Sequence, residues 1–257
     1  MIDSQGVLRK MRKLLSLCSA LVLLVCMVPA VAELEVTWVE GEAFFPERED
    51  WTYRYQYRYP YIAGTEHGAP DINEYYDMAF SEMTNLIVPM FAQEETMIGQ
   101  GKNEIQQEYR ITCNNARFFS TCMEQRQTVG GSLVTSVSSQ VFAVSGEYMG
   151  DTLTLRGLLM TGDSSEQLAG LILADIWRQV AEQAVDDPAW LPGLTMDALY
   201  ADFDPEAHFY ADELGNAVFY LQPGLYRTDD RMITFTYSAA DVNKLIDQFN
   251  QREEGQV

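Results

Sequence analysis

Aromatic and polar residues alternate along residues 51–62, which read WTYRYQYRYPYI. A period of two is typical of a β-strand, here one with a tyrosine face. Pro60 lacks a main-chain donor, which predicts a sheet edge or a bulge at the end of this strand. The tyrosine face admits two interpretations, a sugar-binding surface or, more commonly, a face buried under a helix with hydroxyls at its rim. The candidate binding residues on this rim are Tyr53, Tyr55 and Tyr57.

Apolar residues recur every three or four positions from Ile72 to Phe91, which predicts one long amphipathic helix. Asp71 and Glu74 have the spacing of a capping box at its start. Pro89 lies inside the pattern and predicts a kink. Glycines near residues 99–101 mark the end of the helix.

Two further helices have a polar cap before the apolar stripe, Asp163 with Glu166 in the first and Ser238 with Asp241 in the second. A short helical segment is also expected. The three segments are residues 163–184, 195–200 and 238–249.

The remaining patterned segments read as strands. Ile105, Tyr109, Ile111 and Cys113 recur on one face, and the return strand follows an Asn-Asn turn. Helices therefore lie between blocks of strands without a regular βαβ alternation, which predicts an α+β fold of antiparallel meander sheets packed with two long and one or two short helices. The expected strands are 34–39, 105–113, 118–127, 133–144, 153–159, 208–210, 217–221 and 232–237.

The N-terminus has the layout of a secretory signal peptide. Arg9, Lys10, Arg12 and Lys13 precede an apolar run, and Ala30-Val31-Ala32 supplies a small-x-small cleavage pattern. We therefore expect a mature chain that begins at Glu33 and is secreted or extracytoplasmic. A retained anchor is the alternative, although the run is short for a membrane span of about 20 residues. Met11 is an alternative start.

These patterns divide the chain into four parts. Residues 1–32 are the signal peptide, 33–50 a polar lead-in, 51–250 a single α+β domain, and 251–257 a polar tail. Sub-halves at 51–160 and 161–250 remain open as an alternative within the domain.

The chain is strongly acidic. Residues 1–32 carry four basic residues and one acid, so the mature chain keeps 13 Lys+Arg and 37 Asp+Glu, a formal net charge of −24. Such a surface repels nucleic acid and anionic lipid, and it attracts basic proteins. Beyond the leader, no apolar stretch approaches the length of a membrane span.

Cys113 and Cys122 are the two cysteines of the mature chain, and an exported protein with an even number of cysteines predicts a disulfide. A tight turn at residues 114–117 would instead put them out of register by about four residues, too far for a bridge at about 3.3 Å per residue. Two free thiols are therefore the competing outcome.

Several local motifs resemble one exported domain family, that of anti-sigma-V factors and of the non-catalytic part of certain peptidoglycan deacetylases. The matching segments are Tyr59-Pro60, Gly130-Gly131, Val141 to Leu155, Phe219 to Leu225 (FYLQPGL) and Ile233 to Ser238 (ITFTYS). The resemblance extends from about Trp51 to Ile246 and implies an exported sensing or binding module. In anti-sigma-V factors this module binds lysozyme, a basic enzyme.

The chain departs from the family in two ways. Ser132-Leu133 follows the glycine pair where the family has Ala-His, and neither an anti-sigma segment nor a deacetylase domain is recognisable. The resemblance therefore implies the binding module alone.

No catalytic or metal motif stands out, so we expect no cofactor, no metal and no assigned catalytic residue. His67 and His208 have no ligand spacing, and Asp202 with Asp204, or Asp229 with Asp230, are acids that any acidic chain supplies. The preferred hypothesis is a secreted, non-enzymatic binding or sensing module of the bacterial envelope, for a lysozyme-like basic protein or a peptidoglycan fragment. The alternative is a carboxylate-dependent envelope hydrolase or a deacetylase accessory protein. Further candidate binding residues lie in the loop 224–230, namely Tyr226, Arg227, Asp229 and Asp230.

Overall fold

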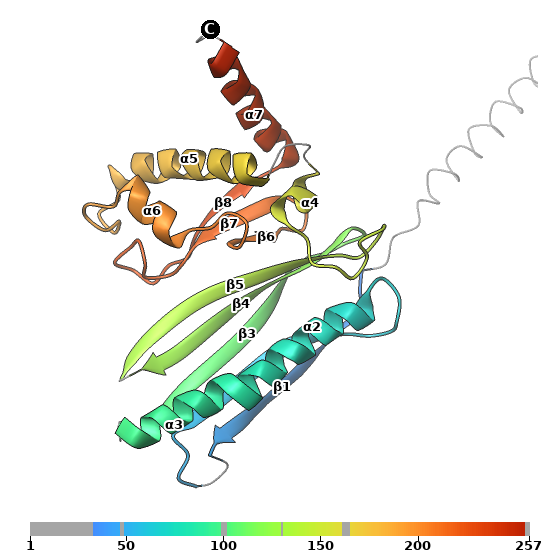
Figure 1. The fold of residues 1–257 in the computed structure, drawn as a ribbon, viewed down its shortest axis with the longest axis vertical. Helices are drawn as coiled ribbons and strands as arrows, with labels where there is room; N and C mark the ends of the chain where they lie inside the picture. Colours follow the sequence, from blue (N-terminus) through green and yellow to red (C-terminus); the bar gives the residue numbers. More distant parts are fainter. Residues whose placement is uncertain (1–32, 47–48, 99–101, 130, 161–164, 255–257) are drawn as a thin grey trace, which may run out of the picture. The chain divides into compact units, whose positions relative to one another are not determined.

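The protein has an α+β fold with a five-stranded and a three-stranded sheet, which confirms the predicted class (Figure 1). The computed structural model describes residues 33–46, 49–98, 102–129, 131–160 and 165–254. Residues 33–257 form one compact unit. The expected signal peptide, residues 1–32, lies outside the described residues, as do Asp163 and the end of the tail. None of the helices described is both long and apolar enough to cross a membrane.

The five-stranded sheet has the order β1-β2-β3-β4-β5. Neighbouring strands are antiparallel except β2 and β3, which are parallel and joined by the long helix. The strand expected at 34–39 is longer, because residues 36–45 all pair with β2. The strands are β1 (Val36–Phe45), β2 (Tyr53–Ile62), β3 (Asn103–Asn114), β4 (Phe118–Val129) and β5 (Ser132–Ala143).

The long helix covers the tyrosine face of β2. It consists of α2 (Ala69–Glu82), a π-helical turn η1 (Met83–Ile87) and α3 (Val88–Ile98). The ring of Phe80 packs against the rings of Tyr55, Tyr57 and Tyr59, and Val88 packs with Tyr53 and Tyr55. The buried interpretation of the tyrosine ladder is therefore the one that the structure shows.

The capping and the proline of this helix were both subjects of a prediction. The predicted capping box is wrong, because the N-cap is Gly68 with φ +75°, three residues before Asp71, and no side chain caps the helix. Pro70 fits the first turn, where a missing N–H costs nothing. Pro89 follows the π-helical turn, whose wider hydrogen-bond spacing accommodates a break in the α-helical ladder.

A bulge in β3 reverses one predicted side-chain direction. The pairing of β3 with β4 shifts between Ile111 and Cys113, so Cys113 leaves the face of Ile111 and packs in the other core. Cys113 then lies opposite Ser120, two residues along the strand from Cys122. The predicted disulfide is wrong, because both cysteines are buried free thiols held out of register.

The second sheet, β6-β7-β8, packs under the C-terminal helices. Its strands are β6 (Phe209–Ala211), β7 (Ala217–Leu221) and β8 (Ile233–Tyr237), close to the predicted ranges. The helices α5 (Ser165–Ala184), α6 (Met196–Asp202) and α7 (Ala239–Glu254) also match expected segments. Ser238 caps α7, since its Oγ accepts from the N–H of Asp241 and donates to that carboxylate, as predicted. The segment at 153–159 is instead a helix, α4 (Leu155–Leu159), capped by the side chain of Thr154.

β7 is buried on both faces and joins two cores. Ala217, Phe219 and Leu221 contact the helix side, whereas Val218 and Tyr220 pack with Cys122 and Val137 of the five-stranded sheet. Five consecutive buried residues are typical of a strand between two layers. The three-stranded sheet therefore lies between the helices and the polar face of the larger sheet.

Candidate functional site

The face of the five-stranded sheet that the long helix leaves open is polar. Strand pairing sets Arg58 opposite Glu40 on β1 and Glu108 on β3, and Gln106 opposite Arg126 on β4. We call this surface the open polar face. Its residues are Glu40, Glu42, Arg54, Gln56, Arg58, Glu104, Gln106, Glu108, Arg110, Glu124 and Arg126.

Ion pairs run across this face between neighbouring strands. Arg54 contacts Glu104 at 2.6 Å, and Arg58 lies 3.7 Å from both Glu40 and Glu108. Arg58 also stacks 3.7 Å above the ring centroid of Trp38. Because four arginines face five glutamates, the open polar face is almost neutral, in contrast to the acidic surface elsewhere.

A groove of about 590 Å³ opens where this face meets the segment that connects β7 to β8. One wall is charged and carries Arg58, Arg110, Arg126, Glu108 and Glu124. The other wall comes from Pro223, Asp230 and Met232, and the floor includes Leu133, Thr135 and Val137. The groove therefore offers both signs of charge beside an apolar strip, a combination suited to a peptide or a sugar with polar substituents.

Two residues that line the groove, Arg110 and Cys122, lie beside Tyr210 of β6. The guanidinium of Arg110 lies 5.2 Å from the ring centroid of Tyr210. Burial acts to lower the pKa of Arg110, but its contacts with Cys122 and Tyr210 outweigh this and raise it. Burial raises the pKa of the Cys122 thiol despite the nearby arginine. Cys122 therefore stays a neutral thiol and is no activated nucleophile.

Gln222 positions the outer wall. Its side-chain amide accepts from the N–H of Val137 at 2.9 Å and donates to the carbonyl of Val137 at 2.8 Å. This pair of hydrogen bonds imitates one step of strand pairing at the edge of β5. It fixes the segment that carries Pro223 and Asp230 against the five-stranded sheet.

The tyrosine candidates lie away from this groove. Tyr53 and Tyr55 are only 2% and 1% exposed, and the hydroxyl of Tyr55 donates to Gln107 at 2.6 Å. Tyr57 is half-buried against Phe80. Since they face the long helix, Tyr53 and Tyr55 have no surface to offer a ligand, and they serve as core residues.

Of the four candidates in the loop 224–230, the structure brings only Asp230 to the groove. Arg227 is buried and donates to Asp187 at 2.7 Å and to Asp229 at 2.6 and 2.8 Å, so it ties this loop to the segment after α5. The hydrogen bonds from Arg227 lower the pKa values of both carboxyl groups. Tyr226 is buried, and desolvation raises the pKa of its hydroxyl. Arg227 and Asp229 therefore brace the loop.

Two of the residues considered above, His208 and Asp204, have local structural contacts. His208 accepts the N–H of Asp204 on Nδ1 at 3.1 Å, and Asp204 in turn accepts from the N–H of Glu206. Burial lowers the pKa of His208, partly offset by Asp204. Within the described part of the chain, no three metal-ligating side chains cluster together.

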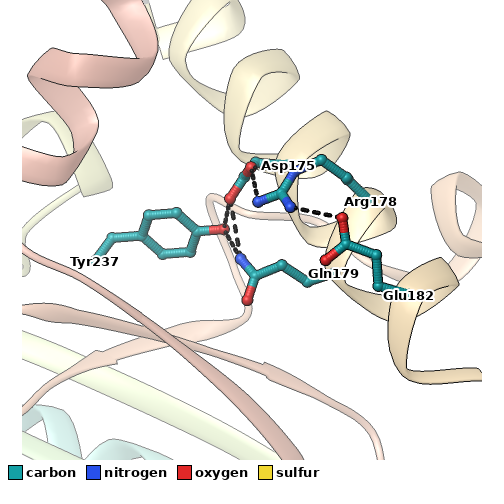
Figure 2. A network of polar contacts seen from close by, with 5 residues as sticks. All are labelled: Asp175, Arg178, Gln179, Glu182 and Tyr237. Atoms are coloured by element: carbon teal, nitrogen blue, oxygen red, sulfur yellow. Dashed lines mark hydrogen bonds and ion pairs between the residues drawn. The ribbon is translucent and has the colours of Figure 1, made fainter. Parts of the chain in front are cut away.

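A second polar cluster lies beneath α5 (Figure 2). The buried hydroxyl of Tyr237, on β8, donates to Asp175 at 2.6 Å, and Gln179 donates to both groups. Arg178 binds the other side of Asp175 and reaches Glu182. The contacts of Tyr237 with Asp175 and Gln179 therefore hold α5 on the three-stranded sheet.

The charged wall of the groove could have been found from the sequence. Arg54, Gln56 and Arg58 alternate with the tyrosines, which places them on the opposite, solvent-facing side of the strand. Their partners on β3 and β4 depend on a register that no local pattern specifies.

Comparison with known proteins gives likeness in structure only. No family model matches the chain, and no curated protein does so by sequence. A DUF3298 family protein from Pseudomonas aeruginosa PAO1 is similar over 83% of this chain and 94% of its own, at 11% identity and a TM-score of 0.56. A member of the same family from Bacteroides fragilis aligns over 82% of this chain and 97% of its own, at 13% identity and a TM-score of 0.46. The chain thus shares the fold of the Pseudomonas DUF3298 protein, which fits the resemblance noted in the sequence at the level of fold.

Proposed function

We propose that residues 33–257 form an exported, non-enzymatic binding module of the bacterial envelope, and that its ligand occupies the groove. The observation that carries this proposal is the groove of about 590 Å³, open on the sheet face that no helix covers and lined by both charged and apolar side chains. Together with the family resemblance and the net charge of −24, it favours a basic protein of the lysozyme kind. A peptidoglycan fragment is the other ligand that the resemblance suggests.

Electrostatic attraction explains why a basic partner suits this molecule. The overall charge speeds its approach, and at the groove Asp230 has no ion-pair partner among the described residues. The nearly neutral sheet face then allows close contact without a large like-charge penalty.

The test is binding of the purified protein to immobilised lysozyme at low and high ionic strength. We expect retention that weakens with salt, because exposed charges are screened. Asp230→Asn and Glu124→Gln should reduce retention, whereas Glu74→Gln, the same loss of charge on exposed α2, should not. Equal retention of all three variants would remove the groove from the proposal. Binding of a soluble muropeptide instead of lysozyme would identify the glycan as ligand.

Export is a separate part of the proposal. We expect the protein in the extracytoplasmic fraction with Glu33 as its first residue, measured by N-terminal sequencing. An intact leader in the cytosolic fraction would contradict this part and leave the groove's binding role to be judged on its own assay.

One observation favours hydrolysis as a second candidate. Glu108 and Glu124 lie directly opposite each other on β3 and β4 and both line the groove, as a pair of catalytic carboxylates would. Arg58 lies 3.7 Å from Glu108, and Arg126 pairs with Glu124, so each carboxylate already has a basic partner in the groove. Release of reducing ends from peptidoglycan, lost in Glu108→Gln, would support this candidate over binding alone.

A further inference from the structure

Strand β5 forms an edge of the five-stranded sheet (Figure 1) and lacks the usual protection of an edge. Its sequence, SLVTSVSSQVFA, contains no charge, proline or glycine, although the chain as a whole is strongly charged. Its pairing with β4 runs without a bulge from Ser132 to Ala143. Native proteins normally block such an edge with charges, prolines or bulges, because it can pair with another strand.

Half of this edge is already covered from within the chain. Val137 pairs with the side chain of Gln222, and the carbonyl of Val141 accepts from Leu153. The N–H of Ala143 donates to Asp151, and its carbonyl accepts from Gly150. Residues 137, 141 and 143 therefore direct their main-chain groups away from β4.

Leu133 and Thr135 continue this alternation, because main-chain groups two residues apart point to the same edge of a strand. Their N–H and C=O groups thus face outward, and among the residues described none has a hydrogen-bond partner at this edge. Leu133 and its neighbour Val134 are 65% and 54% exposed. The first five residues of β5, 132–136, hence present an unpaired strand edge, with the apolar side chains of Leu133 and Val134 on its two faces.

We propose that this edge receives an extended segment of a partner protein as a sixth strand, and that the segment carries a lysine or arginine for Asp230. Thr135 and Leu133 line the same groove as Asp230, so a strand added here places alternate side chains in the groove. Asp230 is an exposed carboxylate without a described ion pair, which selects a cation. Residues 33–257, with a formal net charge of −24, attract a basic segment and repel a second copy of the chain.

This inference deepens the proposed function and rests on it in one respect, that the partner is a protein. It adds the mode of recognition, in which main-chain hydrogen bonds hold the segment and the groove selects its side chains. Variants of the edge and variants of the groove therefore separate the two ideas. If lysozyme binding falls in Asp230→Asn but is unchanged when the edge is blocked, the proposed function stands and strand addition is overturned.

The experiment uses a labelled peptide, KTVTVK, titrated with the purified protein. Thr135→Pro removes an outward N–H while leaving the pairing with β4, because proline is tolerated at the free side of an edge strand. Thr135→Ala is the matched control, since it shortens the side chain and keeps the N–H. We expect Thr135→Pro to bind the peptide about three- to tenfold more weakly than Thr135→Ala, the range for loss of one hydrogen bond. Equal binding by both variants would overturn the proposal.

A second measurement holds even where Thr135→Pro fails to fold. Peptide should slow hydrogen exchange at the amides of Leu133 and Thr135, while those of Val134 and Ser136, already paired with β4, change little. N-methylation of alternate peptide residues should abolish binding for one of the two alternating sets only. Protection spread evenly over residues 132–136, or arising without peptide as protein concentration increases, would contradict the assigned occupant; the latter would identify a second copy.

Discussion

The hydroxyl of Tyr237 offers a direct test of how α5 is held on the three-stranded sheet. Tyr237→Phe removes one oxygen and keeps the buried ring, which is 4% exposed. Asp175 then loses the donor at 2.6 Å, and Gln179 loses one of its two acceptors. Arg178 and Gln179 still contact Asp175, so the carboxylate keeps part of its support.

The size of the effect follows from the burial of Asp175. A hydrogen bond to a charged group stabilises a protein by about 1.5–3 kcal/mol. The side chain of Asp175 is 14% exposed, and water can replace part of the lost contact, so we expect a loss of about 1.5 kcal/mol in the free energy of unfolding. For a unit of this size, this corresponds to a fall in Tm of about 3–6 °C.

The pH dependence gives the prediction a second check. Burial acts to raise the pKa of Asp175, but hydrogen bonds from Tyr237, Arg178 and Gln179 outweigh it and hold the pKa below its ordinary value of 3.8. Stabilisation from a lowered carboxyl pKa is complete above the unfolded-state pKa and is lost as pH falls through the folded-state pKa. The Tyr237→Phe deficit should therefore be constant from about pH 5 to pH 7 and shrink below about pH 4.

The assay is thermal and urea unfolding followed by circular dichroism, with Tyr148→Phe as control. Tyr148 is 62% exposed and loses an equivalent oxygen at no expected cost. In a double-mutant cycle, Asp175→Ala and Tyr237→Phe should be non-additive, because each removes the hydrogen bond between Tyr237 and Asp175. A Tyr237→Phe protein as stable as the unchanged protein would refute the assigned role, and so would a Tyr237→Phe deficit of undiminished size in the Asp175→Ala background.

Three further expectations can be checked by unfolding and labelling. Asn73→Ala should lower the free energy of unfolding by about 2–3 kcal/mol, since it leaves the buried N–H and C=O of Ile62 unpaired; Asn85→Ala, at an exposed site on the same helix, is the control, and equal effects would contradict this. Burial lowers the pKa of His208, so its contribution to stability is present above about pH 6.5 and is lost as pH falls below this value. The free energy of unfolding in urea, measured above and below this pH, should change less with pH in His208→Gln, and the same change in both proteins would contradict this role of His208. Reductant should leave Tm unchanged, and Cys113 and Cys122 should react with a thiol reagent only on unfolding, because both are free and buried. A lower Tm in reductant would instead indicate that the two cysteines form a disulfide.

Local patterns predicted those parts of the fold that depend on one element at a time. The tyrosine strand, the cap at Ser238 and the three strands of the second sheet follow from periodicity and short-range hydrogen bonding. The segment 153–159 is too short for its apolar residues to distinguish a strand from a helix. In the structure it is helical, and the side chain of Thr154 caps the helix.

The remainder depends on pairing between distant strands, which one sequence does not specify. The bulge beside Thr112 reversed the direction of Cys113 and, with the register of β3 and β4, kept the two thiols apart. The groove likewise arises because β7 and β8 are joined by a segment that docks on β5 through Gln222. The sequence alone suggested Asp230 as a binding residue. The residues of β2, β3 and β4 that line the groove with it could be identified only once the order of the strands was known.

The parallel pairing of β2 with β3 has a consequence for the order in which the chain can fold. Residue 53 pairs with residue 103, so this contact closes a loop of about fifty residues, whereas β4 and β5 meet across a short turn. Contacts of large sequence separation form late, because loop-closure entropy must be overcome first. The tyrosine face of β2 is therefore buried only after the long helix and β3 have formed. A chain whose folding stops before this step would expose tyrosine rings to water, which favours aggregation.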